Sequence, residues 1–548
     1  MPPKKAARPA AAKNSRSKSS ANGSAATGAA KKRKHGGSET ASNAKRSWSA
    51  QSAGRSVGKP KAPTPIQGVN KRKTKSKPII NKALTQCLNV YVFGAGEMGE
   101  LGLGRAQAQA QVKRPRLNPL LDADKVGVVS LAVGGMHSAA LTCDNIILTW
   151  GVNDDGALGR NTDEVDDGDI DSDTGLNFNE STPSPVDTAG LPADIVWTQL
   201  ACTDCATFAL TEKGDVYGWG TFRGNEGTMG FDPLHEKQTR PVQLPRLSNI
   251  VQLATGSNHV LALSNKGQVY AWGAGQQNQL GRRILERRKL NGLVPARVGL
   301  PKNVGLVGAG SYNSFAVTES GKVYSWGLNS YGETGIAAQI GDGGESDVPQ
   351  PTIVDSLHPF DRITNIHGGS HHTLAVTIKG DLLVWGRLDG YQLGLQLSSL
   401  PEEDVIRDSA GNLRILKNPT PIPNIDAVYA SAGSDHSVAV ARDGKAYAWG
   451  FSENYQTGLG TKKDVELATQ IDKHGQGVSV SKPPSNDHDN NDASDEEDSI
   501  VPAPTVQNDQ DGIAEKKIVW AGCGGQFSIL AGLAIAKTTN LDGGNGHA

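Results

Sequence analysis

The sequence predicts an all-β fold: a seven-bladed β-propeller closed by its N- and C-terminal strands and preceded by a disordered basic tail. Three observations lead to this prediction. A phrase ending in Trp-Gly recurs six times, a second phrase stands about a dozen residues before each copy, and each end of the repeat region carries only half of the unit. Self-similarity of this kind is typical of repeat architectures.

The amino-terminal segment differs sharply in charge from the remainder of the 548 residues. The first 80 residues hold 20 lysines and arginines and one acid, Glu39, which leaves 36 bases against 55 acids in the rest. Rich in Ser, Ala, Gly and Pro, the segment cannot bury enough apolar surface to offset the entropy of ordering. We therefore expect residues 1–86 to be a disordered tail that binds a polyanion such as DNA.

Two clusters in this tail are typical of nuclear-import signals, and the alternative is that they only add solubilising charge. One is "KRKTKSK" at residues 71–77. The other is "KKRK", which consists of Lys31, Lys32, Arg33 and Lys34. They predict a nuclear protein with an import receptor among its partners.

Composition narrows the class of protein further. No stretch approaches the roughly 18 apolar residues of a membrane helix, and the first residues lack the apolar centre of a secretion signal, so we expect a soluble, intracellular protein. Five cysteines are too few for a disulfide scaffold of this size. Cys202 and Cys205 form a C-x-x-C, but no further ligands complete a zinc set, and we expect no metal and no cofactor.

The repeated unit reads as an antiparallel hairpin with flanking strands. A polar residue before glycine, as in Lys266-Gly267, separates the two phrases and suits a tight turn. The phrases lack the three- and four-residue apolar spacing of a helical solenoid, so radially arranged sheets remain. The spacing of 53 to 69 residues indicates a constant unit with variable loops. The tryptophans are Trp150, Trp219, Trp272, Trp326, Trp385 and Trp449.

The two ends of the region complement each other. "VYVFGAGEMGELGLG" at residues 90–104 has the strand without the upstream phrase, whereas "AGCGGQFSILAG" at 521–532 has the upstream phrase without Trp-Gly. Together they make one blade, so the propeller should span residues 87–540. Deleting either end should open the ring.

Two acidic segments, about residues 161–185 and 471–513, interrupt the pattern. They contain "DEVDDGDIDSD" and "DHDNNDASDEED" and few apolar residues. We expect disordered insertions between blades. They either add solubility or interact with the basic tail.

The paired phrases, G-G-x-H-S/T-x-A-L followed by V-Y-x-W-G and G-x-L-G, resemble the regulator of chromosome condensation family over residues 87–535. The resemblance implies a monomeric, chromatin-bound guanine-nucleotide exchange factor for the nuclear GTPase Ran, which promotes GDP release and GTP loading without covalent chemistry. Such a factor binds the nucleotide-free GTPase more tightly and thereby weakens nucleotide binding by the same factor.

"TFRGNEG", which follows Trp219-Gly220, resembles the protruding β-wedge of the founding member of the family. The resemblance implies that this segment displaces the phosphate-binding elements of the GTPase while acidic loops take over their lysine. The predicted wedge consists of Thr221, Phe222, Arg223, Gly224, Asn225, Glu226 and Gly227.

The resemblance also assigns residues that contact the GTPase from one face of the propeller. Asn258 stands where the family has an aspartate, so a role that needs a negative charge there is in doubt. The assigned residues are Glu97, Asp204, Asn258, Arg282, His371 and Asp435. In contrast, the repeat histidines should bridge adjacent blades through their ring nitrogens. These histidines are His137, His259, His372 and His436.

"GRRILERRKLNG", after Trp272-Gly273, resembles the family's loop that reaches a histone surface, and its arginines suit carboxylates. The alternative is a solvated basic loop. The resemblance implies that nucleosome histones and DNA bind the tail and the face opposite the GTPase. Pro2-Pro3-Lys4 also resembles an N-terminal methylation substrate. The predicted chromatin-binding residues are Lys4, Lys5, Arg283, Arg287, Arg288 and Lys289.

Another class of function remains open at this point: a chromatin-binding propeller scaffold without exchange activity. A third class, a propeller hydrolase, has no convergent acid, base or metal set in the sequence. Loss of nucleotide release on removal of residues 221–227 would separate the exchange factor from the scaffold.

Overall fold

The computed structural model describes residues 77–104, 111–163, 176–337, 340, 346–471 and 517–534. Within this part the chain forms seven antiparallel sheets of four or five strands and one separate two-stranded hairpin. Each sheet is one blade. The first-named strand of each blade below lies innermost.

The first three blades follow the chain in order, and a hairpin of β10 (Phe222–Gly224) and β11 (Gly227–Gly230) leaves the second. Blade 1 has β3 (Val128–Val133), β4 (His137–Thr142), β5 (Ile147–Gly151) and β6 (Ser184–Pro185). Blade 2 has β7 (Trp197–Cys202), β8 (Ala206–Thr211), β9 (Val216–Gly220) and β12 (Gln238–Gln243). Blade 3 has β13 (Ile250–Thr255), β14 (His259–Ser264), β15 (Val269–Gly273) and β16 (Ala296–Arg297).

The next three blades repeat the arrangement, and the fifth carries an additional outer strand. Blade 4 has β17 (Val304–Ala309), β18 (Asn313–Thr318), β19 (Val323–Leu328) and β20 (Asp347–Ile353). Blade 5 has β21 (Ile363–Gly368), β22 (His372–Thr377), β23 (Leu382–Arg387), β25 (Leu413–Pro421) and β24 (Val405–Arg407). Blade 6 has β26 (Ala427–Ala432), β27 (His436–Ala441), β28 (Ala446–Gly450) and β29 (Val465–Gln470).

Blade 7 joins the two ends of the propeller. It has β30 (Ile518–Cys523), β31 (Phe527–Leu533), β1 (Leu88–Ala95) and β2 (Gln111–Leu117). Short helices occupy some connections. They are α1 (Phe178–Ser181) and the 3₁₀ helices η2 (Pro119–Leu121), η3 (Glu286–Leu293), η5 (Asp355–Leu357), η6 (Leu397–Ser399) and η7 (Glu402–Asp404).

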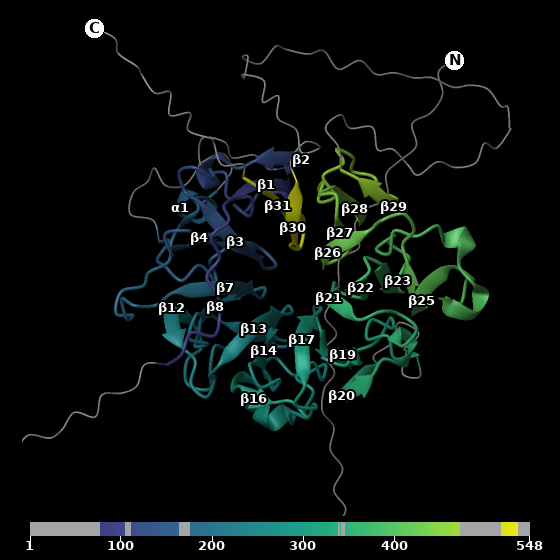
Figure 1. The fold of residues 1–548 in the computed structure, drawn as a ribbon, viewed down its shortest axis with the longest axis horizontal. Coiled ribbons are helices and arrows are strands. Elements are labelled where there is room, and N and C mark those ends of the chain that lie inside the picture. Colours follow the sequence, from purple (N-terminus) through teal and green to yellow (C-terminus); the bar gives the residue numbers. More distant parts are fainter. Residues whose placement is uncertain are drawn as a thin grey trace, which may run out of the picture. The chain divides into compact units, whose positions relative to one another are not determined.

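The sheets form a ring (Figure 1). The innermost strands β3, β7, β13, β17, β21, β26 and β30 contact one another in sequence, and β30 contacts β3. The prediction of a seven-bladed propeller is confirmed. Strand β1 pairs with β31 from Leu88↔Leu533 to Gly94↔Phe527, so the N- and C-terminal strands do close the last blade.

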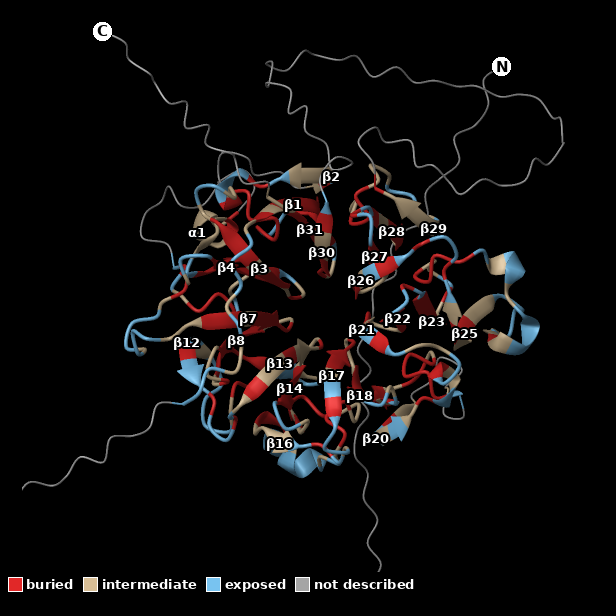
Figure 2. Ribbon diagram, viewed as in Figure 1, coloured by how far each residue is buried: buried red, intermediate tan, exposed pale blue. Residues whose placement is uncertain are grey.

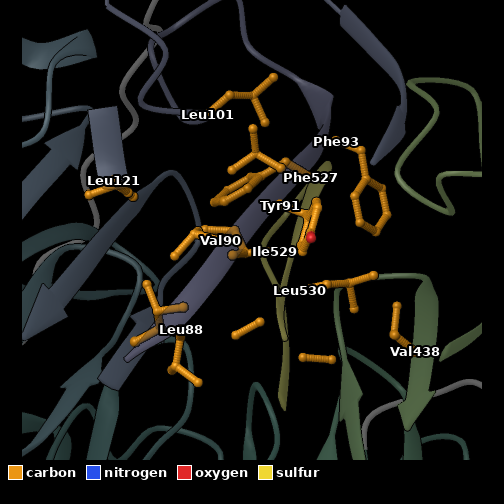
Figure 3. Packing of buried hydrophobic residues seen from close by; sticks show 14 of the residues in the cluster. Leu88, Val90, Tyr91, Phe93, Leu101, Leu121, Val438, Phe527, Ile529 and Leu530 are labelled. Carbon is orange, nitrogen blue, oxygen red and sulfur yellow. The ribbon is translucent and has the colours of Figure 1, made fainter. Parts of the chain in front are cut away.

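The seam in blade 7 is strongly apolar. Figure 3 shows Val90, Tyr91 and Phe93 of β1 beside Ile529 and Leu530 of β31. All five side chains are at most 2% exposed. Burial of that apolar surface stabilises ring closure, which supports the expectation that removing either terminal strand opens the ring.

Burial follows the order of strands in each blade (Figure 2). The second strand of blades 1 to 6 is buried along its whole length. Outer strands such as β12 and β29 are mostly half-buried or exposed. The core of the molecule therefore lies between the blades, close to the axis.

Alternation of turns gives the ring two distinct faces. Because the strands of a blade are antiparallel, the turn between strands one and two and the loop between strands three and four emerge on one side. We call it the loop face. The tight turns between strands two and three, such as Lys266-Gly267, emerge on the other side, which we call the hairpin face.

The repeat histidines bridge neighbouring blades as predicted. Each imidazole Nε2 lies within hydrogen-bonding distance, 2.8 or 2.9 Å, of a hydroxyl in the next blade. The pairs are His137–Thr207, His259–Ser314, His372–Ser437 and His436–Ser528. Packing requires the glycine that stands three residues before each of these histidines. A Cβ on Gly256, for example, would lie 2.3 Å from Cε1 of His259.

The repeat tryptophans make a second set of bonds between blades. Each indole Nε1 donates to a backbone carbonyl in the loop that follows the third strand of the preceding blade, at 2.7 to 3.0 Å. The pairs are Trp150–Glu100, Trp219–Ala157, Trp326–Gln279, Trp385–Glu333 and Trp449–Gln392. Among the described residues, Trp272 is the exception.

The structure corrects two of the expected boundaries. Residues 77–86, assigned to the tail, belong to the described structure: Ile80 N donates to Glu212 O at 2.8 Å, and Asn81 Nδ2 donates to Thr211 O on the hairpin face. Residues 176–185, assigned to an acidic insertion, instead form α1 and β6. Strand β6 completes blade 1 because Ser184 pairs with Thr149.

Candidate functional site

The β10–β11 hairpin leaves the loop face of blade 2 at the position of the predicted wedge. Its register pairs Arg223 with Thr228 and Gly224 with Gly227, so Asn225 and Glu226 form the turn at the tip. These two turn residues are exposed. The hairpin extends to Gly230 and is thus longer than the predicted segment 221–227.

The base of the hairpin is part of the core. Thr221 and Phe222 are fully buried, and the ring of Phe222 stacks 5.9 Å from that of Phe208. Thr221 Oγ1 donates to Glu236 O at 2.6 Å. The first two predicted wedge residues therefore anchor the hairpin, and residues 223–228 form the part that projects.

Blade 3 supports one side of the hairpin through amide side chains. Asn258 Oδ1 accepts a hydrogen bond from Arg223 N at 2.8 Å, and Gln276 Oε1 accepts one from Asn225 N at 2.7 Å. Gln277 Nε2 donates to Asn225 Oδ1 at 2.8 Å. Asn258 therefore holds the backbone of the hairpin, a role that a neutral amide fulfils without a negative charge.

Ion pairs support the hairpin from two directions. Arg223 Nη1 lies 3.3 Å from Asp155 Oδ2 in the loop of blade 1, and this carboxylate raises the pKa of Arg223. Lys289 in the loop of blade 3 pairs with Glu226 and lowers the pKa of that carboxyl group. The hairpin is thus fixed between blades 1 and 3 at three of its exposed residues.

The hairpin replaces a loop that other blades use to bind the next tryptophan. Among the described residues, Nε1 of Trp272 is buried without a hydrogen-bond partner. Leaving such a donor unpaired costs about 1–3 kcal/mol. The edge-on contact of Trp272 with Phe208, at 5.6 Å between ring centroids, compensates through apolar packing.

A cavity of about 380 Å³ lies beside the tip of the hairpin. Asn225, Gln277, Tyr312, Leu328 and Asp347 are among its lining residues. Apart from Leu328 these side chains are amide, phenol or carboxylate groups. Such a lining suits a polar or basic side chain of a partner.

Asp204 lies at the mouth of the central channel on the loop face. Its backbone N donates to Ser257 O, and Oδ1 lies 2.8 Å from the position that a Cβ on Gly135 would take. Burial raises the pKa of Asp204 to about 6, opposed by a hydrogen bond from Ser257. A nearby cation of a partner would relieve the cost of keeping this carboxylate ionised.

His371 and Asp435 belong to one polar network on the same face. His371 Nδ1 lies 3.2 Å from Oε1 of Glu333, a carboxylate whose side chain is 1% exposed. Asp435 Oδ1 lies 3.8 Å from Nη1 of Arg387. The Arg387 guanidinium covers the Tyr331 ring, which also contacts His371.

Two of the other predicted contacts differ in their surroundings. Glu97 is exposed in the loop between β1 and β2. Arg282, in contrast, turns into its own loop, where Nη2 donates to Val294 O at 3.2 Å and approaches other carbonyls. Its burial lowers its pKa. Arg282 therefore stabilises the loop, and the geometry does not support a direct contact with a partner.

The basic loop of blade 3 lies next to the wedge hairpin. Arg283, Arg287 and Arg288 are exposed, whereas Lys289 pairs with Glu226. The loop connects the third and fourth strands of its blade, so it belongs to the loop face. These residues therefore lie on the same face as the wedge hairpin, and their contact with chromatin stays a prediction.

Other predicted residues lie outside the described part of the chain. They are Lys4, Lys5, Lys31, Lys32, Arg33 and Lys34. The first described residue, Lys77, pairs with Asp215 on the hairpin face. In the described residues, no helix is long and apolar enough to cross a membrane.

Within the described residues, seven sheets in a closed ring and a separate two-stranded hairpin define the class of the protein: a β-propeller. Comparison with known proteins agrees, because residues 89–482 match the RCC1-like domain. This chain belongs to the RCC1-like domain family.

Relatives share most of their length with the chain. Protein pim1 of Schizosaccharomyces pombe is 43% identical, over 87% of this chain and 79% of that protein. The guanine nucleotide exchange factor SRM1 of Saccharomyces cerevisiae is 38% identical, over 82% and 88% respectively. The regulator of chromosome condensation of Homo sapiens is 31% identical, over 69% and 83%.

Solved structures show the same fold. The crystal structure of Prp20p from Saccharomyces cerevisiae, described with its binding properties to Gsp1p and histones, matches with a TM-score of 0.70 and 37% identity. The match covers 83% of this chain and 94% of Prp20p. A further structure holds the same yeast protein bound to Kap60, with a TM-score of 0.70.

Sequence reasoning missed the residues that hold the hairpin in place. Gln276 and Gln277 lie in "GQQNQLG", which reads as an ordinary repeat loop, and Asp155 lies in the equivalent loop of blade 1. No signal in the sequence distinguishes them, because their role follows from the closure of the ring around blade 2.

Proposed function

We propose that this protein is a guanine-nucleotide exchange factor for a nuclear GTPase of the Ran type, and that it acts while bound to chromatin. The names of its relatives support the proposal, since one is a guanine nucleotide exchange factor and another was studied for its binding to Gsp1p and histones. The observation that carries it is the hairpin of residues 222–230 on the loop face, which side chains of blades 1 and 3 hold in place.

Exchange by this geometry requires no covalent step. A protein that binds the nucleotide-free GTPase more tightly than the loaded form weakens nucleotide binding by the same factor. A 10⁵-fold faster release needs about 7 kcal/mol of differential stabilisation. A mobile hairpin would lose part of that free energy on ordering, whereas the bonds from Asp155, Asn258 and Gln276 hold this hairpin in place before the partner arrives.

Acidic groups near the hairpin can receive the basic side chain that the nucleotide phosphates release. Asp204 at the channel mouth and Asp347 in the cavity beside the tip are the candidates from blades 2 and 4. Because burial raises the pKa of Asp204, a lysine or arginine placed beside it would favour the charged form. The exposed Glu97 adds negative charge to the same face.

Chromatin contact has two points of attachment in this proposal. Arg283, Arg287 and Arg288 are available on the loop face for the carboxylates of a histone surface. The basic tail joins the propeller at Lys77 on the hairpin face. Binding through the tail alone would leave the wedge hairpin on the loop face uncovered.

Shortening the hairpin tests the proposal. Residues 223–228 are replaced by Asn-Gly, which favours a two-residue turn, while the buried Thr221 and Phe222 remain. We expect release of a fluorescent GDP from the Ran-type GTPase to fall by at least about 10³-fold, with retention on nucleosomes unchanged.

A second hairpin supplies the matched control. The turn between β24 and β25, residues 408–412 of blade 5, projects at the outer edge of the ring and is replaced by the same dipeptide. This variant should keep full exchange activity. If a folded variant without its wedge tip releases GDP as fast as the wild type, the hairpin does not carry the exchange reaction. If the wild-type protein itself does not accelerate GDP release, the protein is a chromatin-binding scaffold.

A further inference from the structure

Two cysteine thiols that are far apart in the sequence lie near each other on the hairpin face. Cys87 directly precedes β1 of blade 7, and Cys143 follows β4 of blade 1. The neighbouring Cys143 thiol contributes to raising the pKa of Cys87. Both sulfur atoms adjoin Gly127: a Cβ on that residue would lie 2.5 Å from Sγ of Cys143 and 3.6 Å from Sγ of Cys87.

The backbone holds the two residues in this arrangement. Cys143 N donates to Gly127 O at 2.8 Å, and Ala534 N donates to Cys87 O at 3.1 Å. Cys87 is thereby attached to the end of the C-terminal strand, while Cys143 is attached to the linker that enters blade 1. Cys143 is exposed and Cys87 is half-buried, so a small oxidant reaches Cys143 first.

We propose that Cys87 and Cys143 form a reversible disulfide that fastens the closing blade to blade 1 under oxidising conditions. Hydrogen peroxide is the oxidant. The thiolate of Cys143 attacks one peroxide oxygen, giving a sulfenic acid and hydroxide, which takes up the displaced thiol proton as water. The Cys87 sulfur then attacks the sulfenic sulfur, and the disulfide forms with loss of a second water. Two thiols are oxidised and one peroxide is reduced.

The remaining cysteines do not compete for this reaction. Cys202 and Cys523 are buried in innermost strands, and burial raises the pKa of each thiol to about 12. Cys205 lies on the loop face beside Asp155 and Arg223. In the described residues, no group of three metal-ligating side chains surrounds the Cys87–Cys143 pair, which favours a thiol reaction over metal binding there.

The raised pKa of Cys87 slows the reaction at neutral pH. Desolvation, the neighbouring Cys143 thiol, and the charges of Asp124 and Asp144 all raise the pKa of Cys87. The Cys87 thiolate is therefore scarce at neutral pH, and disulfide formation should accelerate as the pH rises from 7 to 9. The two thiols should form a disulfide under sustained oxidation and stay reduced at the reducing potential of the nucleus.

The bond would act on ring closure and leave the wedge untouched. It constrains the chain between residues 87 and 143, which includes β1, the strand that pairs with the C-terminal β31. Constraining such a loop stabilises the folded state, chiefly through the unfolded chain. Because the pair lies on the face opposite the wedge hairpin, exchange activity should not depend on it at moderate temperature.

Peptide mapping of the full-length protein tests the proposal. After treatment with hydrogen peroxide and alkylation of free thiols, mass spectrometry should find one cross-linked peptide pair joining Cys87 and Cys143, and dithiothreitol should remove it. The thermal unfolding midpoint of the oxidised protein should rise by about 2–4 °C.

Single variants supply the controls. Cys87→Ser and Cys143→Ser should each abolish both the cross-link and the rise in midpoint, whereas Cys205→Ser should preserve them. If Cys143 is instead oxidised to sulfinic or sulfonic acid in the folded wild-type protein with no cross-link to Cys87, the proposal is wrong.

Discussion

Two junctions between neighbouring blades are closed differently, although the blades have the same repeated sequence pattern. One joins blades 4 and 5, and the other joins blades 2 and 3. In the first, Glu333 O accepts bonds from Trp385 Nε1 at 3.0 Å and from Thr373 Oγ1 at 2.7 Å. In the second, the corresponding loop has become the wedge hairpin, and Nε1 of Trp272 is buried without a partner within the described structure.

Side chains around the wedge junction are adapted to this loss. Blade 2 has Ala206 at the position of the bridging histidine, and blade 3 has Val260 at the position of the accepting hydroxyl. Both are fully buried. An apolar pair replaces a polar one, so no imidazole or hydroxyl is left unpaired there. Bridges between a histidine and a hydroxyl close four of the junctions, whereas aromatic packing closes the junction that carries the wedge hairpin.

Acid should weaken the ordinary junctions most strongly. Burial lowers the pKa of His137 to about 4 and those of His259, His372 and His436 to about 3. The unfolded chain, with an ordinary histidine pKa near 6.5, takes up protons first as the pH falls. The stability from keeping these rings neutral is complete above about pH 6.5 and is lost progressively below it. At pH 5 the loss should be about 2 kcal/mol per histidine, measured as a falling unfolding midpoint.

A matched variant isolates this contribution. His372→Asn introduces the residue that blade 4 uses at the same position, Asn313. Its unfolding midpoint should depend less on pH between 6.5 and 4.5 than that of the wild-type protein. An unchanged pH dependence would show that carboxylates, and not the bridging histidines, dominate acid unfolding.

Breaking the support of the wedge should affect exchange and leave the ring stable. Asn258→Ala removes the acceptor for Arg223 N, and we expect kcat for GDP release to fall about tenfold, corresponding to about 1.4 kcal/mol, because the hairpin loses its position. Asn258→Asp keeps the oxygen acceptor and should retain activity within about threefold.

The two kinetic constants distinguish positioning from direct contact. If Asn258 positions the hairpin, Asn258→Ala changes kcat with KM nearly unchanged. A rise in KM with kcat preserved would instead make Asn258 a residue that contacts the GTPase.

The smallest effect compares two tryptophans directly. Trp326→Phe removes an indole that donates to Gln279 O at 2.8 Å, whereas Trp272→Phe removes an unpaired donor. Both variants lose similar ring volume. The first should therefore be less stable than the second by about 1 kcal/mol, which is about 1 °C in unfolding midpoint for a propeller of this size. Equal midpoints would remove the energetic distinction between the two junctions.

Much of the fold could be predicted because each repeat is encoded by residues that are close together in the sequence. Turn glycines, alternating strands and half-units at the termini indicated seven blades and the closing pair β1–β31. Bridging by histidines such as His259 followed from their recurrence at one place in the unit. The extent of the acidic insertion was less accurate, because residues 176–185 have no strong strand pattern although Ser184 pairs with blade 1.

The candidate site was predictable in its location and less so in its contacts. The resemblance of residues 221–227 placed the wedge, but buried Thr221 and Phe222 belong to its base. Arg282 was expected to face a partner, yet its guanidinium binds carbonyls of its own loop. A loop sequence shows which side chains are charged, and it does not show which of them the loop uses for its own folding.

The sequence by itself determined the repeat, the number of blades, the closure by the two ends and the basic tail, because each depends on residues close together in the chain. Only the tertiary structure decided what surrounds the wedge and which cysteines meet. Asp155, Asn258 and Gln276 reach one hairpin from two other blades. Such contacts depend on how blades are set against one another around the ring, and no local pattern encodes them.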